Sequence, residues 1–363
     1  MKILYDARYL LVDERFDGVS RYTLGLAEAL ERRSDTEMTW LISDERQLAK
    51  LPSAPHVLAN DPKNALRELF LPKLLGRYKT DVVYSPFFIM GSVGRRYPLI
   101  LTIHDMIYFH FSTPPYQFSW WIRLGWRLFH LTYWPMRLTL NRASAVATVS
   151  TTARIELEQA RATKRTIATV RNAVDQSSTS PSVDHSASHR IVYMGAFMPY
   201  KNPECLIDAL ANLPDVTLDL MSKIVPERRH ELEERARRLG VAERVVFHDG
   251  VSDEEYHAAL ANARCLVTAS KIEGFGLPII EAQQQGIPVV CSDIPIFHEV
   301  GAHSVLYFDP DSPLALAAKI QKLADKETNE DFVQRGYDNA KRFTWDASAE
   351  QAIALCEQVL RAK

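Results

Sequence analysis

Residues 264–301 read RCLVTASKIEGFGLPIIEAQQQGIPVVCSDIPIFHEVG, and their pattern indicates the class of fold. It contains a short apolar run, a glycine-rich turn, a helical pattern that opens at Pro278, and a second apolar run after Gly286. Proline suits the first turn of a helix, where its missing N–H has no intrahelical partner, and glycine often follows a helix end. Because both runs are short and apolar, the stretch predicts strand, turn, helix and strand in a buried parallel sheet.

The same alternation of short apolar runs and amphipathic helical stretches continues in both directions along the chain. Strands are predicted for Ile3–Tyr5, MTWLIS, DVVYSP, LILTIHD and AVATVS in the first half, and for RIVYMG, VTLDLM, RVVFHDG, RCLVTAS and IPVVCS in the second. Helical patterns such as RYTLGLAEALERR and PERRHELEERARRLG lie between them. This order predicts an α/β fold with parallel sheets built from βαβ units.

The charge distribution divides the chain in two. Residues 1–175 carry 24 basic and 17 acidic side chains, whereas residues 176–363 carry 19 and 28. The sign changes at QSSTSPSVDHSASH, residues 176–189, whose six serines and lack of large apolar residues are typical of a linker. A length of 363 residues also favours two domains. We therefore predict domains at 1–175 and 190–363, joined by a linker at 176–189.

Composition excludes several classes of protein. A net charge of −2 argues against a nucleic-acid binder that works through overall positive charge. The four cysteines are far apart, which predicts buried free thiols, and no His or Cys spacing indicates a metal. Asp6 and Arg8 interrupt any signal peptide, and no run approaches the roughly 20 apolar residues of a membrane span. We expect a cytoplasmic protein.

The turn at EGFGLPIIE carries the strongest chemical signal. Gly274 and Gly276 allow a ligand to approach the backbone, and the N–H groups at the helix N-terminus suit a phosphate. Glu273 precedes this turn, and Glu281 lies about one helical turn after it. Both carboxylates can face the carboxyl end of a strand and accept protons from sugar and ribose hydroxyls. The alternative is two solvated glutamates that flank a structural turn.

These residues resemble a known family, the retaining glycosyltransferases of family 4, through its E-x7-E motif. Other segments are similar to family motifs and occur in the family's order. They are GVSRY at Gly18, His104-Asp105, TVSTTAR with Ser150 and Arg154, RNAVD at 171–175, YMGAFMPYKNP with Gly195 and Lys201, HDGVSDEEYHAAL with Val251, and DIPIFHEVG with Glu299. The resemblance implies the GT-B fold, in which two Rossmann-like domains face a central cleft. It also implies that the last helix, about 346–361, packs back on the N-terminal domain.

The resemblance also implies roles for individual residues. Glu273 would hold the donor sugar, His104 would lie near the reacting centre, and Lys201 would stabilise the leaving diphosphate. Further donor-binding positions are Gly18, Lys223, Val251, Gly274, Phe275, Gly276, Leu277 and Glu281. Structural alternatives are a buried His104, a solvated Lys201, and a helix-capping Asp105, which would otherwise lie on the acceptor side. No metal or other cofactor is implied.

The sequence departs from the family pattern in two ways. Asp17 precedes Gly18 where many members have a second glycine, and Ala196 and Tyr200 stand where an arginine is usual. One cation expected on the donor diphosphate is therefore absent, and Lys223 is a candidate to supply charge.

Residues 107–137 form an aromatic and basic segment that contains four of the six tryptophans. It predicts either a helix packed inside the first domain or an element that contacts an anionic membrane at headgroup depth. For the second interpretation we name Trp120, Trp121, Arg123 and Arg127. Together with the basic first half, this segment suits an acidic or lipid-linked acceptor at the inner face of a membrane.

The resulting hypothesis is transfer of a hexose from a nucleotide-diphosphate sugar, first GDP-mannose, to a glycan or lipid-linked acceptor in cell-surface polysaccharide synthesis. The alternative is a non-catalytic nucleotide-sugar or glycan-binding protein on the same scaffold. A dinucleotide-dependent oxidoreductase is disfavoured, because residues 11–25 lack a Gly-x-Gly-x-x-Gly pattern. UDP- and dTDP-linked donors stay open at this stage.

Overall fold

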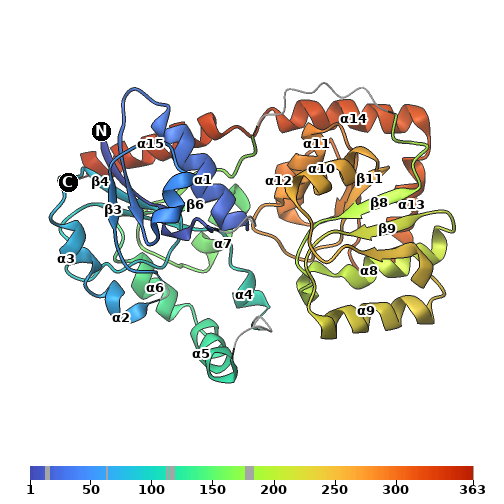
Figure 1. Ribbon diagram of the computed structural model, residues 1–363, viewed down its shortest axis with the longest axis horizontal. Helices are drawn as coiled ribbons and strands as arrows, with labels where there is room; N and C mark the ends of the chain where they lie inside the picture. Colours follow the sequence, from blue (N-terminus) through green and yellow to red (C-terminus); the bar gives the residue numbers. More distant parts are fainter. Residues whose placement is uncertain (13–16, 63, 112–113, 115–118, 176–183, 363) are drawn as a thin grey trace. The chain divides into compact units, whose positions relative to one another are not determined.

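The computed structural model describes the chain except residues 13–16, 63, 112–113, 115–118, 176–183 and 363. It contains two compact units (Figure 1). The first consists of Met1–Asp175 with Thr344–Lys363, and the second of Gln176–Phe343. Of the expected linker at 176–189, residues 176–183 lie outside the described part. In the remainder His185 and Ser186 are buried, and Ser188 Oγ donates to the carbonyl of Asn262, so this end packs on the second unit.

Within its described residues, the first unit contains a seven-stranded parallel sheet in the order β3-β2-β1-β4-β5-β6-β7. The strands are β1 (Lys2–Asp6), β2 (Glu37–Ile42), β3 (His56–Leu58), β4 (Val82–Ser85), β5 (Leu99–Ile103), β6 (Ala145–Thr148) and β7 (Ile167–Thr169). Its helices are α1 (Gly18–Glu31), α2 (Ala65–Glu68), α3 (Leu71–Leu75), α4 (Ile107–His110), α5 (Trp120–His130), α6 (Trp134–Leu140), α7 (Thr151–Gln159) and α15 (Trp345–Arg361). The central strands β4, β5 and β6 are buried along their whole length, as parallel strands covered on both faces must be.

The described part of the second unit forms a six-stranded parallel sheet in the order β10-β9-β8-β11-β12-β13. The strands are β8 (Arg190–Tyr193), β9 (Thr217–Leu220), β10 (Val245–Phe247), β11 (Cys265–Thr268), β12 (Val289–Ser292) and β13 (Leu306–Phe308). The helices are α8 (Pro203–Ala209), α9 (Pro226–Arg238), α10 (Asp253–Ala261), α11 (Leu277–Gln284), α12 (Pro295–Gly301), α13 (Pro313–Lys322) and α14 (Lys326–Ala340). Helices α8 and α9 cover one face of this sheet, and α11 and α14 lie on the other (Figure 1).

Both sheets are doubly wound, so the predicted α/β fold with parallel sheets is confirmed. The strand order reverses between β1 and β4 in the first unit and between β8 and β11 in the second. Ligands of such sheets bind beyond the carboxyl ends of the strands at this switch point. The topology therefore singles out one place in each unit where a ligand site is expected.

The long helix α15 returns the chain to the first unit and packs on α1. The Trp345 ring lies edge-on to Tyr22 with centroids 6.1 Å apart, and a Cβ at Gly25 would come within 2.0 Å of the indole. Two hydrogen bonds join α15 to the chain at Arg171. The Arg171 N–H donates to Gln351 Oε1 at 2.9 Å, and Ser348 Oγ donates to the Arg171 carbonyl at 2.7 Å. A glycine on α1 is thus what allows α15 to approach so closely.

The four cysteines are free and buried, as predicted. Burial raises the pKa of the Cys265 and Cys356 thiols to about 12, so these thiols are protonated and unreactive at neutral pH. They therefore act as small core residues.

Candidate functional site

Lys201 and Glu273 form an ion pair beside the switch point of the second unit. Lys201 Nζ lies 2.5 Å from Glu273 Oε1, and both side chains are largely buried, at 19% and 12% exposure. Ser270 Oγ donates to the same carboxylate oxygen at 2.7 Å. Glu273 is therefore held in place by two donors on residues that precede it in the chain.

The sheet brings these residues together although they are 72 positions apart. Lys201 ends a 3-10 turn, Pro199–Lys201, that follows β8, whereas Glu273 follows the neighbouring strand β11. The Lys271 N–H donates to the Tyr200 carbonyl at 2.8 Å, which joins the two loops through their backbones. The pair thus lies at the carboxyl ends of the two strands that flank the switch point, where a doubly wound sheet binds its ligand.

Helix α11 begins directly after this loop, as the sequence predicted. Its N-cap Gly276 has a left-handed φ of 102°, makes no side-chain cap, and is followed by Leu277 and Pro278. A Cβ at Gly276 would come 2.8 Å from the Phe297 ring, so only glycine fits here. The N–H groups of the first turn give this end a partial positive charge that suits a phosphate.

The remaining predicted donor residues of the second unit lie on α11, in the turn before it, and on the loops that follow β9 and β10. Glu281 is buried on α11, one turn from its start, and Leu277 is the half-buried first residue of the same helix. Gly274 is half-buried in the turn that precedes the helix. The Phe275 ring is buried edge-on against Phe343 at 5.8 Å, so a donor contact from Phe275 must come from its backbone.

Lys223 and Val251 lie on two neighbouring loops at the carboxyl ends of β9 and β10. The Gly250 N–H donates to the Met221 carbonyl at 3.1 Å, and the Ile224 N–H donates to Asp249 Oδ1 at 3.1 Å. These bonds hold exposed Lys223 near half-buried Val251. The two predicted residues therefore share one loop pair at the edge of the sheet that also carries Glu273.

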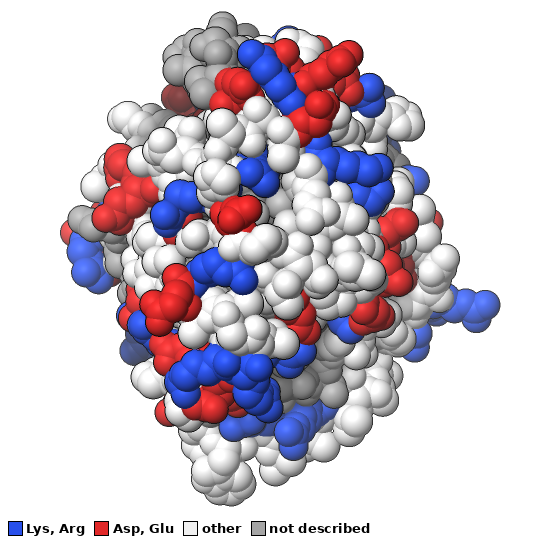
Figure 2. Space-filling model, turned by 90° about the vertical axis from the view of Figure 1, so that its right-hand side faces the viewer, with Lys and Arg blue, Asp and Glu red and all other residues white. Residues whose placement is uncertain are grey.

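The charges of the second unit are spread out on the face that Figure 2 shows, where acidic and basic side chains alternate. Several of its carboxylates are paired, including Asp208 with Arg235 and Glu204 with Arg228. These arginines neutralise the carboxylates that they pair with.

His104 belongs to the first unit and follows β5 directly. Its Nε2 lies 2.8 Å from the Pro86 carbonyl, and because a carbonyl only accepts, Nε2 carries the proton. The ring lies edge-on to Tyr22 at 5.0 Å. Burial lowers the pKa of His104 below its ordinary value, so the imidazole is neutral at pH 7 and Nδ1 is left as an acceptor.

Asp105 and Asp17 both accept a hydrogen bond from a backbone N–H at the start of a helix. Asp105 Oδ1 accepts from the Ile107 N–H at 3.0 Å, at the first residue of α4, whose N-cap is Met106. Asp17 accepts from the Ser20 N–H at 2.7 Å and is the N-cap of α1, whose first residue is Gly18. The Asp17 carboxylate occupies the place that a phosphate would take at this helix end, so Gly18 is a weaker donor candidate than Lys201.

Helix α5 exposes a continuous set of large apolar side chains, and none of its residues is buried. Trp126 packs edge-on to Tyr108 at 4.8 Å, which leaves the opposite face outward. We call the outward side chains of Trp120, Trp121, Leu124 and Leu128, which are 77%, 62%, 52% and 59% exposed, the apolar face of α5. Arg127 is exposed and Arg123 half-buried on the same helix. The interpretation that all these aromatics pack inside the first domain is therefore wrong.

The described residues contain neither a membrane-spanning helix nor a metal-binding cluster. No helix there is both long and apolar enough to cross a membrane. No group of three or more His, Cys, Asp or Glu side chains in the same part of the chain could hold a metal ion.

Sequence reasoning missed two features of the site. Ser270, which orients Glu273, gave a weak signal as a polar residue directly after an apolar strand. Asp6 and Arg8 were noted only as interruptions of a signal peptide. In the structure they form a buried ion network with Glu68 at the switch point of the first unit.

Comparison with known proteins gives two consecutive family matches. Residues 16–178 match Glycosyltransferase Family 4, and residues 181–339 match Glycosyl transferases group 1. The O-antigen chain mannosyltransferase B of Escherichia coli is 35% identical over 170 residues, which are 45% of this chain and 44% of that protein. The match thus spans less than half of that relative's length.

Solved structures resemble the whole chain at low sequence identity. Sucrose-phosphate synthase of Thermosynechococcus elongatus has a TM-score of 0.77 at 20% identity and covers 100% of both chains. Anabaena HepE in complex with UDP and glucose has a TM-score of 0.74 at 21% identity, covering 99% of this chain and 100% of that one. These likenesses confirm the predicted GT-B class of fold. By its two family matches, which together account for most of its length, the chain belongs to the glycosyltransferases of family 4, group 1.

Proposed function

We propose that this protein is a retaining glycosyltransferase that moves a hexose, first mannose, from a nucleotide-diphosphate sugar to a glycan or lipid-linked acceptor. The observation that carries the proposal is the largely buried Lys201–Glu273 pair beside the N-terminus of α11. It combines a cation, a carboxylate and backbone N–H groups at the switch point of the second unit. Those are the groups that a sugar diphosphate needs, since it presents both phosphates and hydroxyls.

The proposed mechanism rests on stabilising the leaving group. As the bond to the anomeric carbon breaks, negative charge builds on the diphosphate, and preorganised donors lower the barrier most. Lys201, the first turn of α11 and exposed Lys223 would supply those donors. Glu273 would accept a hydroxyl proton of the donor sugar, and Glu281 would bind the ribose. The leaving phosphate itself would take the proton of the acceptor hydroxyl.

His104 would contribute as a neutral hydrogen-bond acceptor. Its Nε2–H is engaged with Pro86, so Nδ1 is the atom that would receive a hydroxyl of the sugar. The lowered pKa keeps Nδ1 unprotonated at neutral pH. We propose this acceptor role for His104 and not that of a general acid.

The donor base is tested by thermal unfolding with nucleoside diphosphates. At a hundredfold excess over Kd, a ligand stabilises the fold by about 2.7 kcal/mol, a rise of roughly 5–10 °C in Tm for a unit of this size. We expect GDP and GDP-mannose to give the largest shift, because the E. coli relative is named a mannosyltransferase. A larger shift with UDP or dTDP would contradict the mannose assignment alone. No shift with any diphosphate would contradict the donor site, with nucleoside monophosphates as the matched control.

We further propose that the first unit contacts the cytoplasmic face of an anionic membrane through the apolar face of α5. Tryptophan rings favour headgroup depth, and Arg127 can bind lipid phosphates. We expect the protein to float with liposomes that contain anionic lipid, and the double substitution Trp120→Ala, Trp121→Ala to weaken binding about tenfold or more.

The control for this experiment is Leu314→Ala, an equally prominent apolar side chain of the second unit that is 66% exposed. It is expected to float like the unchanged protein. If the protein stays in solution, or if the Trp double variant floats equally well, the membrane proposal fails while the transferase proposal stands.

A further inference from the structure

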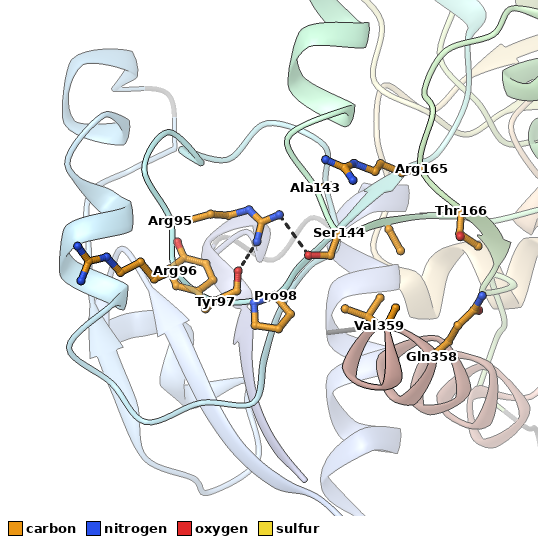
Figure 3. Close-up of a pocket in the computed structure, with 12 residues that line it drawn as sticks. Arg95, Arg96, Tyr97, Pro98, Ala143, Ser144, Arg165, Thr166, Gln358 and Val359 are labelled. Atoms are coloured by element: carbon orange, nitrogen blue, oxygen red, sulfur yellow. Dashed lines mark hydrogen bonds between the residues drawn. The ribbon is translucent and has the colours of Figure 1, made fainter.

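The first unit contains a cavity of about 440 Å³ that the proposed reaction does not use. Its walls come from the segments that enter β5, β6 and β7 and from the last turn of α15 (Figure 3). Arg95 to Pro98 precede β5, whereas His104 follows it. The cavity is therefore at the amino-terminal edge of the sheet, and the carboxyl edge, where such sheets bind substrates, is the opposite one.

Arg95 and Arg165, two of the three arginines that line this cavity, have no carboxylate partner among the described residues. Arg95 is held by neutral acceptors: its Nε and Nη2 donate to the Arg142 carbonyl at 2.9 and 2.7 Å, its Nη2 also donates to Ser144 Oγ at 3.1 Å, and its Nη1 donates to the Tyr97 carbonyl. Arg165 Nε donates to the Asn141 carbonyl at 2.9 Å. Among the described residues, no protein group accepts from the Nη atoms of Arg165, and neither arginine forms an ion pair.

The two guanidinium groups act on each other. Burial lowers the pKa of Arg95, and repulsion from Arg165 adds to this effect. Arginine nevertheless stays charged at neutral pH. The carbonyl groups at the C-terminal end of α15 supply only partial negative charge, which does not neutralise two full cations. An anion between them would remove the repulsion and accept from Arg165, in the planar geometry that suits phosphate.

The rest of the lining is suited to hydroxyl groups. Ser144, Thr166 and Gln358 are uncharged hydrogen-bonding residues, and Pro98 and Val359 supply apolar contact. Figure 3 shows Gln358 and Val359 on α15 on the other side of the cavity from Arg165, while Arg96 extends away from both. The volume lies within the usual range for small-molecule sites, about 300–1,000 Å³.

We propose that this cavity binds a small phosphorylated polyol of hexose-phosphate size. The phosphate lies between Arg95 and Arg165, and the hydroxyls bond to Gln358 and Thr166. Because one wall belongs to the last turn of α15, the ligand ties the end of this helix to the sheet of the first unit and stabilises that contact. The proposal does not depend on the transferase activity.

The test is calorimetric titration of the full chain with glucose 6-phosphate, glucose and inorganic phosphate, in the presence of saturating GDP to occupy the donor site. We expect saturable binding of glucose 6-phosphate at least tenfold tighter than of either other probe, and a rise in Tm. Arg165→Gln is expected to weaken it at least tenfold. Gln358→Ala is expected to weaken the binding of glucose 6-phosphate but not the binding of inorganic phosphate.

Arg46→Gln is the matched control, because Arg46 is an exposed arginine of the same unit that pairs with Asp44. It should bind like the unchanged protein. Equal binding to the Arg165→Gln variant, with its unfolding curve unchanged, would overturn the proposal. Binding of glucose as tight as that of its phosphate would also overturn it. Equal affinity for inorganic phosphate would overturn the polyol assignment.

Discussion

Glu273→Ala is expected to lower kcat for sugar transfer by about 10²–10³-fold, the typical loss when one preorganised polar group at a reacting centre is removed. In the proposed reaction the carboxylate would be the fixed acceptor for the donor sugar, and it accepts from Lys201 Nζ at 2.5 Å and Ser270 Oγ at 2.7 Å. Loss of the carboxylate removes this acceptor, and it also leaves the Lys201 ammonium group without the ion pair that positions it. Glu273→Gln, which keeps the shape but not the charge, is expected to lose nearly as much.

The measurement separates binding from chemistry. We expect the variants to keep the Tm shift with the nucleoside diphosphate, because Glu273 is assigned to the sugar and not to the base or ribose. Asp311→Ala is the matched control, since Asp311 is an exposed carboxylate that pairs with Lys271. Lys271 lies on the same loop as Glu273. It should alter kcat by less than about twofold, as substitutions away from reacting groups do.

Two outcomes would contradict this assignment. Glu273→Ala with transfer close to that of the unchanged protein would remove Glu273 from the reaction. An unchanged protein that binds nucleotide sugars but neither transfers nor hydrolyses any of them would instead support the non-catalytic alternative. The positions of Ala196 and Tyr200, where family members usually have arginine, are the sequence observation behind that alternative.

Arg8→Ala is expected to destabilise the first unit by about 3–5 kcal/mol, the usual cost of breaking a buried ion pair from one side. The Arg8 side chain is fully buried and donates to Asp6 Oδ1 and Oδ2 at 2.7 and 3.0 Å, to Glu68 Oε1 at 2.6 Å, and to the Asn60 carbonyl at 3.1 Å. Burial by itself lowers the pKa of Arg8, but the carboxylates of Asp6 and Glu68 outweigh it, so the net pKa is raised.

The cost arises because Asp6 and Glu68 would stay buried without their cation. Asp6 has no exposed side-chain surface and Glu68 has 8%. Denaturant unfolding followed on the first unit measures the loss, and Arg46→Ala, which breaks an exposed pair, should leave the midpoint nearly unchanged. Arg8→Met combined with Glu68→Gln should recover part of the loss. If Arg8→Ala unfolds at the same denaturant concentration as the unchanged protein, the network is not a source of stability.

This network also explains why the two units differ at equivalent places. In the first unit, Asp6 ends β1 and accepts from Ser85 Oγ, at the end of β4, at 3.2 Å. The switch point between these strands is therefore filled by the protein's own charges. In the second unit the equivalent place holds Lys201 and Glu273, which retain some exposure.

The strands of both sheets were largely predictable from local sequence. Runs such as LILTI and RCLVT are apolar and short, and they form β5 and β11. The strands β3, β7 and β13 were not predicted. Each has three residues and lies at the edge of its sheet, where pairing on one side requires little apolar sequence.

For the aromatic segment at 107–137, the sequence predicted a helix but not whether its side chains are buried. A pattern of Trp, Leu and Arg on several faces is the same whether the helix packs in a core or faces outward. The structure decided this by packing only the Trp126 side of α5. For Asp105 the sequence was likewise consistent with a site residue or a cap, and it did not record that the carboxylate accepts from the Ile107 N–H.

The α/β class, the parallel sheets and the turn at Glu273 to Gly276 follow from the sequence, because they depend on neighbours within one strand, turn or helix. The pairing of Lys201 with Glu273, the contact of Arg8 with Glu68, and the cavity lined by Arg165 and Gln358 arise only in the folded chain. Each of those contacts joins residues far apart in the chain. Sheet order and side-chain packing, which no local pattern records, are what bring them together.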